Sequence, residues 1–138
     1  MELSLKEIER AAERLKPVLH HTELDLSSTF SNMSGGEIYL KCENRQKTGS
    51  FKIRGASNKI AALVERGEVS SVVASSAGNH AQGVAFAARD MGIPATICIP
   101  AGAPLSKIEA TRSYGANVVL VPGVYDDAAA YAEKIEQD

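Results

Sequence analysis

The sequence predicts an α/β protein with an open parallel sheet and helices on both of its faces. From residue 50 onward, short apolar runs alternate with amphipathic stretches of helical length. The apolar runs are continuous stretches of Val, Ile and Ala, which is typical of strands buried on both faces. Glycines follow several of the helical stretches, where helices commonly end. These three observations indicate βαβ units.

The first predicted element is a helix that precedes this alternating region. Ser4 to Glu7 match a capping box, and Pro17 stops the helical pattern. Residues 20–36 are polar and rich in Ser and Thr, and Gly35-Gly36 predicts a turn before a short strand at 37–42. The apolar residues with helical spacing in the first element are Leu5, Ile8, Ala12 and Leu15.

The alternating region itself predicts three strands and four helices. The strands are expected at 71–75, 95–99 and 117–121. The helices are expected at 53–64, 81–91, between Pro104 and Gly115, and at 126–137. A βαβ progression places a further strand after such a terminal helix, so we expect the chain to be a fragment.

Composition narrows the class of function. The chain has 138 residues, 44% hydrophobic and 23% charged, which is typical of a soluble domain with one core. Its net charge is −2 with the two signs mixed, so no basic face is expected for nucleic acid. The N-terminus has no apolar segment for export or a membrane, and we expect a cytoplasmic protein. Cys42 and Cys98 lie in apolar runs and predict buried thiols, and no metal site is expected.

The first candidate site is KTGSFKIRGA, residues 47–56. Gly49 permits a tight turn, and Ser50 can cap the helix that follows. Lys52 then lies in the first turn of that helix, where the helix dipole disfavours a cation. Only a neutral amine attacks a carbonyl, so Lys52 is a candidate for imine formation. On these residues alone, a solvated lysine beside Arg54 is the favoured interpretation.

The second candidate site is SSAGNHAQG, residues 75–83, at the carboxyl end of a predicted strand. A strand that runs through small residues into a helix exposes backbone N–H groups, which suit a carboxylate or phosphate. The pattern matches neither a P-loop nor the spacing of dinucleotide sites. Asn79 is equally compatible with a simple helix cap, and for His80 a surface histidine is the favoured interpretation.

Together the two motifs resemble those of fold-type II pyridoxal-phosphate enzymes, specifically the threonine and serine dehydratase branch. The resemblance continues through YLKCENRQ before the first motif, and through IPAGAPLSKIEATRSYGANVVL and VYDDAAAYA after the second. It therefore covers nearly all of the chain. It implies the fold of that family's smaller domain and pyridoxal 5'-phosphate as the cofactor.

The resemblance also implies roles for individual residues. Lys52 matches the lysine that binds the cofactor as an imine, and Phe51 matches an aromatic residue near the pyridine ring. Asn79 matches the amide that contacts the ring hydroxyl. The segment that matches the loop holding the substrate carboxylate consists of Ser76, Ala77, Gly78, Asn79 and His80.

The implied reaction is α,β-elimination from L-threonine or L-serine, which gives a 2-oxo acid and ammonia. Lys52 would remove the α-proton. In the serine racemase branch a serine stands at the position of Ala77 and acts on the opposite face of the substrate. A methyl group cannot do this, so Ala77 favours a dehydratase over a serine racemase-like enzyme. The preference between threonine and serine is left open, as is an isoleucine-biosynthetic or catabolic role.

The family's phosphate-binding glycine loop and its partner for the pyridine nitrogen lie beyond the equivalent of residue 138. The resemblance assigns residues 1–50 to the larger domain and residues 51–138 to the smaller domain without its last strand. We therefore expect the chain to be inactive alone and the full-length protein to be a homo-oligomer. One alternative is a non-catalytic module for small molecules or nucleotides, against which the intact KTGSFKIRGA argues. Another is an interaction protein that pairs with a full-length homologue.

Overall fold

The fold is organised around a parallel sheet in the second half of the chain. The computed structural model describes residues 3–137. Its sheet has three strands in the order β3-β4-β5, and both neighbouring pairs are parallel. The strands are β3 (Val72–Ser75), β4 (Ala95–Pro100) and β5 (Asn117–Val121). The predicted parallel sheet is confirmed, with each strand within one residue of its expected bounds.

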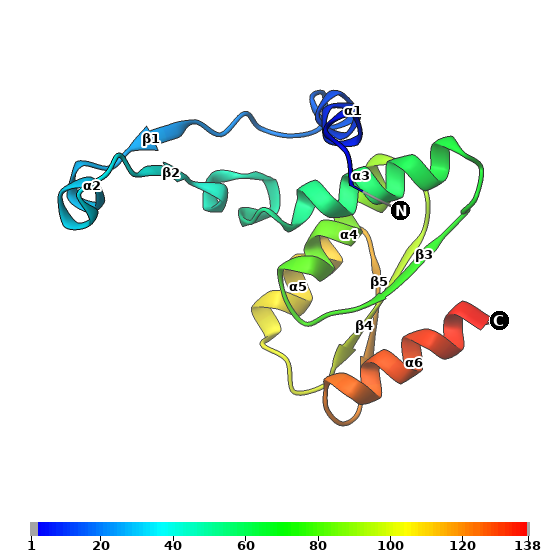
Figure 1. Cartoon of the computed structure of the whole chain (residues 1–138). Coiled ribbons are helices and arrows are strands. Elements are labelled where there is room, and N and C mark those ends of the chain that lie inside the picture. Colours follow the sequence, from blue (N-terminus) through cyan, green and yellow to red (C-terminus); the bar gives the residue numbers. More distant parts are fainter. Residues whose placement is uncertain (1–2, 138) are drawn as a thin grey trace.

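Helices cover both faces of this sheet, as predicted (Figure 1). One face carries α4 (Asn79–Asp90) and α5 (Leu105–Ser113), and the opposite face carries α6 (Tyr125–Gln137). α3 (Lys52–Glu65) packs mainly against α4, and α1 (Leu5–Leu15) packs against α3. The layers on the first face therefore run from the sheet through α4 to α3 and then α1.

The central strand β4 explains why its sequence is apolar without interruption. Ile97 and Ile99 face the cluster formed with α4 and α5, whereas Cys98 faces the cluster formed with α6. All three side chains are fully buried. Successive residues of a strand point to opposite faces, so a strand between two helical layers buries every side chain.

The residues between α1 and α3, which include β1, α2 and β2, form an arm that extends away from this body (Figure 1). β1 (Leu24–Leu26) pairs antiparallel with β2 (Tyr39–Lys41), and α2 (Ser28–Ser34) connects the two strands. β2 lies within the predicted strand at 37–42, but β1 and α2 were not among the predicted elements. The Ser27 hydroxyl caps α2, and Gly35 ends it at φ 75° in the left-handed region.

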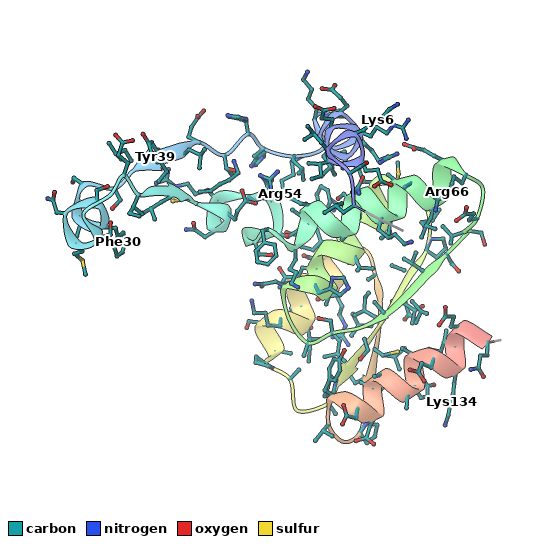
Figure 2. All side chains as sticks on the ribbon, in the orientation of Figure 1. Lys6, Phe30, Tyr39, Arg54, Arg66 and Lys134 are labelled. Carbon is teal, nitrogen blue, oxygen red and sulfur yellow. The ribbon has the colours of Figure 1, made fainter. Side chains whose placement is uncertain are left out.

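The arm and α1 leave large apolar side chains in solvent. Phe30 and Tyr39 lie far out on the arm (Figure 2) and are 49% and 50% exposed. In α1, the capping box is confirmed, but Leu5 and Ile8 of the apolar stripe are exposed and only Leu15 is buried. The first part of the chain thus presents apolar surface that a folded domain normally buries.

Two short 3-10 turns connect the arm to α3. They are η1 (Glu43–Arg45) and η2 (Lys47–Gly49), and they bring the chain from the arm to the first residue of α3. Within residues 3–137, every helix is too short or too polar to cross a lipid bilayer.

Candidate active site

The backbone before Lys52 adopts an uncommon conformation. Thr48 and Gly49 are consecutive residues in the left-handed region, with φ of 63° and 70°. Glycine adopts this conformation freely, but for Thr48 it is unusual and must be held by its surroundings. The predicted turn at Gly49 is confirmed. The Ser50 hydroxyl accepts a hydrogen bond of 3.4 Å from the Lys52 N–H, although Phe51 occupies the cap position.

Lys52 is the first residue of α3, and its amine is exposed. The amine Nζ lies 5.4 Å from the centre of the Phe51 ring, within the range of a cation–π contact. Phe51 is itself 59% exposed. The structure thus places an accessible amine and an accessible aromatic ring side by side.

The backbone of Lys52 lies directly against α4. A side chain at Gly83 would place its Cβ 3.3 Å from the carbonyl carbon and oxygen of Lys52. Only glycine permits this approach without a shift of one of the two helices. The pKa of His80, one turn earlier in α4, is lowered by burial and then by the positive charge of Lys52. Lys52 and the loop at the start of α4 are therefore neighbours.

The loop between β3 and α4 contains the residues predicted for the substrate carboxylate. Gly78 occupies the cap position of α4, which has no side-chain cap among the described residues. The Gly78 N–H donates to the Ser76 hydroxyl at 3.2 Å. Asn79 does not cap the helix, because its Oδ1 accepts a hydrogen bond of 3.2 Å from Lys107 Nζ. The first N–H groups of α4 thus lack a side-chain acceptor and suit an anion.

Three buried hydroxyl groups lack a hydrogen-bond partner within residues 3–137. They are Ser75 Oγ at the end of β3, Thr48 Oγ1 in the loop before Lys52 and Ser57 Oγ in α3. Protein atoms cover all three almost completely, so they do not mark an open ligand site. An amine, an accessible aromatic ring and an uncapped helix N-terminus fit a cofactor that has an aldehyde, a flat ring and anionic groups.

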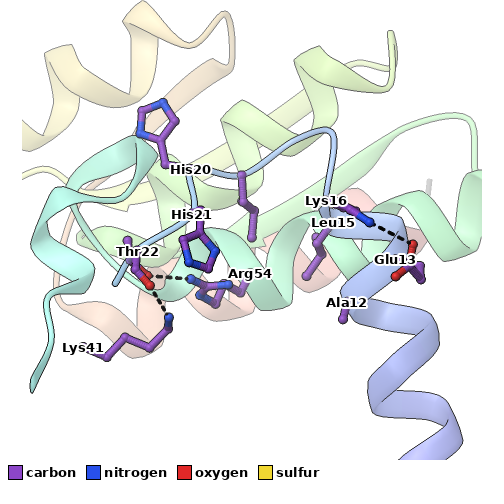
Figure 3. A pocket seen from close by; sticks show the side chains of 10 residues that line it. Ala12, Glu13, Leu15, Lys16, His20, His21, Thr22, Lys41 and Arg54 are labelled. Atoms are coloured by element: carbon purple, nitrogen blue, oxygen red, sulfur yellow. Dashed lines mark hydrogen bonds and ion pairs between the residues drawn. The ribbon is translucent and has the colours of Figure 1, made fainter. Parts of the chain in front are cut away.

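A polar cluster that was not predicted fixes the arm to the start of α3. Arg54 donates two hydrogen bonds to Glu43, from Nε to Oε2 at 2.7 Å and from Nη2 to Oε1 at 2.8 Å. The Thr22 hydroxyl lies 2.6 Å from Glu43 Oε1 and 3.2 Å from Arg54 Nη2, and Figure 3 shows its contact with Arg54. The hydrogen bonds from Arg54 lower the pKa of Glu43 from 4.5 to about 2. We call Thr22, Glu43 and Arg54 the arm cluster.

A buried glutamine between η1 and η2 holds this part of the chain against the segment that follows α1. Gln46 is 4% exposed, and its side chain binds the backbone of His20 in both directions. Its Oε1 accepts from the His20 N–H at 3.0 Å, and its Nε2 donates to the His20 carbonyl at 2.7 Å. Neither Gln46 nor the arm cluster has a sequence signature, because each partner lies on a segment brought close only by folding.

The chain is similar over almost its whole length to known enzymes. Residues 15–138 match the family described as Pyridoxal-phosphate dependent enzyme. The chain is 56% identical over 135 residues to L-threonine ammonia-lyase of Thermotoga maritima, covering 98% of this chain and 34% of that protein. It is 44% identical over 137 residues to the catabolic L-threonine dehydratase of Staphylococcus aureus, covering 99% of this chain and 40% of that protein.

Solved structures of enzymes are also similar to the chain over almost its whole length. Maize serine racemase superposes with a TM-score of 0.90 at 37% identity, over 99% of this chain and 42% of that chain. Threonine deaminase isoform 2 from Solanum lycopersicum superposes with a TM-score of 0.83 at 32% identity, over 99% of this chain and 39% of that chain. The chain thus spans well under half of each of these relatives. The family match over residues 15–138, together with the two motifs and the sheet that positions them, shows that the chain belongs to the family of pyridoxal-phosphate-dependent enzymes.

Proposed function

We propose that this chain is the N-terminal part of an ammonia-lyase that converts L-threonine or L-serine to a 2-oxo acid and ammonia. The observation that carries the proposal is the placement of Lys52 against α4, beside the loop that opens that helix. The similarity to an L-threonine ammonia-lyase over 98% of the chain supports the same reaction.

Each candidate residue has a task that its position allows. Lys52 would hold the cofactor through its amine, with the Phe51 ring beside the cofactor and the Asn79 amide at its ring hydroxyl. The bound cofactor supplies an electron sink for the negative charge that develops at the substrate α-carbon. Once the substrate amine has replaced Lys52 on the cofactor, the freed amine of Lys52 would take the proton from that carbon, which is the proton transfer that elimination requires.

The start of α4 would bind the substrate carboxylate. The backbone N–H groups of Asn79 and His80 lie in the first turn of a helix without a side-chain cap, where the helix dipole favours an anion. The pKa of His80 is lowered by burial and then by the charge of Lys52, which favours the neutral imidazole, and a neutral imidazole could donate one ring N–H to the carboxylate. Ser76, Ala77 and Gly78 form the rest of this loop.

A racemase is the alternative that the structural relatives raise, since two serine racemases superpose with TM-scores of 0.90 and 0.87. Racemisation needs a proton donor or acceptor on each face of the substrate. Ala77 has only a methyl group, which packs against the apolar cluster of the first face. The proposal therefore favours elimination.

The exposed apolar surface supports the proposed division into domains. Residues 1–50 would belong to a larger domain that covers α1 and the arm, where Leu5, Phe30 and Met33 are now exposed. Residues 51–138 would form the smaller domain, in which the outer strands β3 and β5 each have one edge that is unpaired among residues 3–137, so either edge could receive a further strand. On this basis the chain alone is inactive.

The proposal also covers the cellular compartment, the oligomeric state and the metabolic role of the enzyme. The two cysteines are free, which suits a reducing compartment such as the cytoplasm. The whole protein would act on a free amino acid as a homo-oligomer, in biosynthesis of isoleucine or in catabolism of threonine.

A chimera tests the proposed reaction. In it, this chain replaces the matching 34% of the Thermotoga maritima L-threonine ammonia-lyase. With pyridoxal phosphate and L-threonine, we expect the chimera to form 2-oxobutanoate, and the Lys52→Ala variant to lose this activity while remaining folded. L-serine and the appearance of D-serine are measured in parallel.

Three results would count against the proposal. One is a folded chimera with bound cofactor that forms no 2-oxo acid from either amino acid. Another is full activity in the Lys52→Ala variant. A third is racemisation that is faster than elimination, which would favour the racemase alternative in spite of Ala77.

A further inference from the structure

Arg54 lies two residues after Lys52, in the first turn of α3. Its guanidinium reaches back to the arm cluster, where it meets Glu43 in a two-point ion pair. The Arg54 side chain is 34% exposed and the Glu43 side chain 16%, so this pair is partly shielded from water.

The loop that leads into Lys52 is held at both of its ends. On one side Gln46 is fixed to the backbone of His20, and on the other Arg54 is fixed to Glu43. Between these two anchors lie Thr48 and Gly49 in the left-handed region. A residue such as Thr48 keeps this conformation only where its surroundings enforce it, and these two anchors flank it on either side along the chain.

We propose that the Glu43–Arg54 pair is a positioning device for Lys52, which fixes the start of α3 so that the amine lies beside the loop that opens α4. This inference rests on the proposed function of Lys52. Neither Glu43 nor Arg54 is assigned a contact with the substrate, because the two side chains bind each other. They act through the backbone of the first turn of α3, which Gly83 contacts from the other side.

A second ion pair on the same helix provides a matched control. At the far end of α3, Glu65 accepts two hydrogen bonds from the Arg14 Nε and Nη2 groups, at 3.1 and 3.0 Å. This pair joins α1 to α3, just as the Glu43–Arg54 pair joins the arm to α3. Loss of either pair weakens the attachment of α3, but only the Glu43–Arg54 pair lies next to Lys52.

The test compares three variants of the full chain with the unchanged chain: Glu43→Gln, Arg54→Lys and Glu65→Gln. Each is treated with pyridoxal phosphate and then borohydride, which converts a reacting lysine amine to a stable secondary amine. The share of label on Lys52 is measured by peptide mapping against the exposed Lys59 and Lys134. Unfolding curves select a temperature at which all the proteins are folded.

We expect Glu43→Gln and Arg54→Lys to lower the share of label on Lys52 by roughly 3- to 10-fold, because small displacements of a reacting group have large effects on rate. Glu65→Gln should leave that share unchanged. Arg54→Lys keeps the charge and loses only the two-point geometry, so it serves as the milder variant if Glu43→Gln does not fold.

An unchanged share in the folded Glu43→Gln or Arg54→Lys variant would overturn the inference and leave the proposed function intact. An equal loss in Glu65→Gln would also overturn it, since the effect would then follow general loosening of α3. If Lys52 is not the preferred lysine in the unchanged chain, the proposed function fails, and the inference fails with it.

Discussion

At Lys52 the backbone and the side chain have different surroundings. The peptide group is packed against Gly83, whereas the amine is exposed beside Phe51 and near His80. This combination suits a residue that must be fixed in place and yet react with a partner that enters from outside. The position of the helix start, and not the burial of the amine, is what defines the site in this chain.

The nearness of Lys52 to His80 leads to a prediction about a histidine pKa. Replacing Lys52 by Ala removes a positive charge, so the pKa of His80 should rise toward its ordinary value of 6.5. It should stay below that value, because burial is the larger cause of the shift and remains in the variant. Titration of the His80 ring by NMR measures this, and an identical pKa in both proteins would place the amine away from the loop.

Glu43 predicts a dependence of stability on pH. The pKa of Glu43 falls from 4.5 to about 2 on folding. The ionised carboxylate therefore contributes its full share to the free energy of unfolding above pH 4.5, and that share is lost as the pH falls toward 2. We expect Glu43→Gln to lower the free energy of unfolding at neutral pH by about 2 kcal/mol, typical of hydrogen bonds to charged groups. Denaturant titrations at several pH values should show this difference shrinking below 4.5. A difference that stays constant with pH would contradict the assignment.

Among the elements, β4 and the arm represent opposite extremes of packing. Ile97 in β4 is fully buried, whereas Met33 in α2 is 77% exposed. Ile97→Ala should therefore lower the free energy of unfolding by about 3 kcal/mol through the lost contacts and the cavity that remains. Met33→Ala should change it by less than about 0.5 kcal/mol. Denaturant unfolding of both variants measures the contrast, and equal effects would show that the arm is packed in solution.

The same contrast explains which elements the sequence predicted. The elements from residue 50 onward were predicted because each buries an apolar run or stripe against the sheet, and burial leaves a pattern. β1 and α2 bury little, and neither the three residues of β1 nor the Ser-rich α2 shows such a periodicity. A signal for α2 was present in Ser27 before the helix and Gly35 after it.

For the candidate site, the two motifs predicted the lysine, the turn at Gly49 and the loop at the start of α4. The arm cluster was not predictable, because Glu43 and Arg54 are charged residues 11 positions apart that meet only through the turns between them. The proximity of Gly83 to Lys52 also depends on how α3 packs on α4. A glycine inside a predicted helix was the one available hint of such close packing.

At the scale of the whole molecule, packing is uneven along the chain. The sheet and its helices form a core on both faces, while α1 and the arm expose apolar side chains. We expect the isolated chain to produce no steady 2-oxo acid from threonine with added pyridoxal phosphate. An assay of 2-oxo acid over many turnovers measures this. Sustained turnover would show that the described residues suffice for catalysis.

The account depends most on the identity of one lysine, and mapping that lysine tests it most directly. The unchanged chain is treated with pyridoxal phosphate, reduced with borohydride and digested, and the label on each lysine is quantified. The account predicts that Lys52 carries more label than any other lysine in the chain. Label spread evenly over exposed lysines such as Lys59 and Lys134 would contradict it.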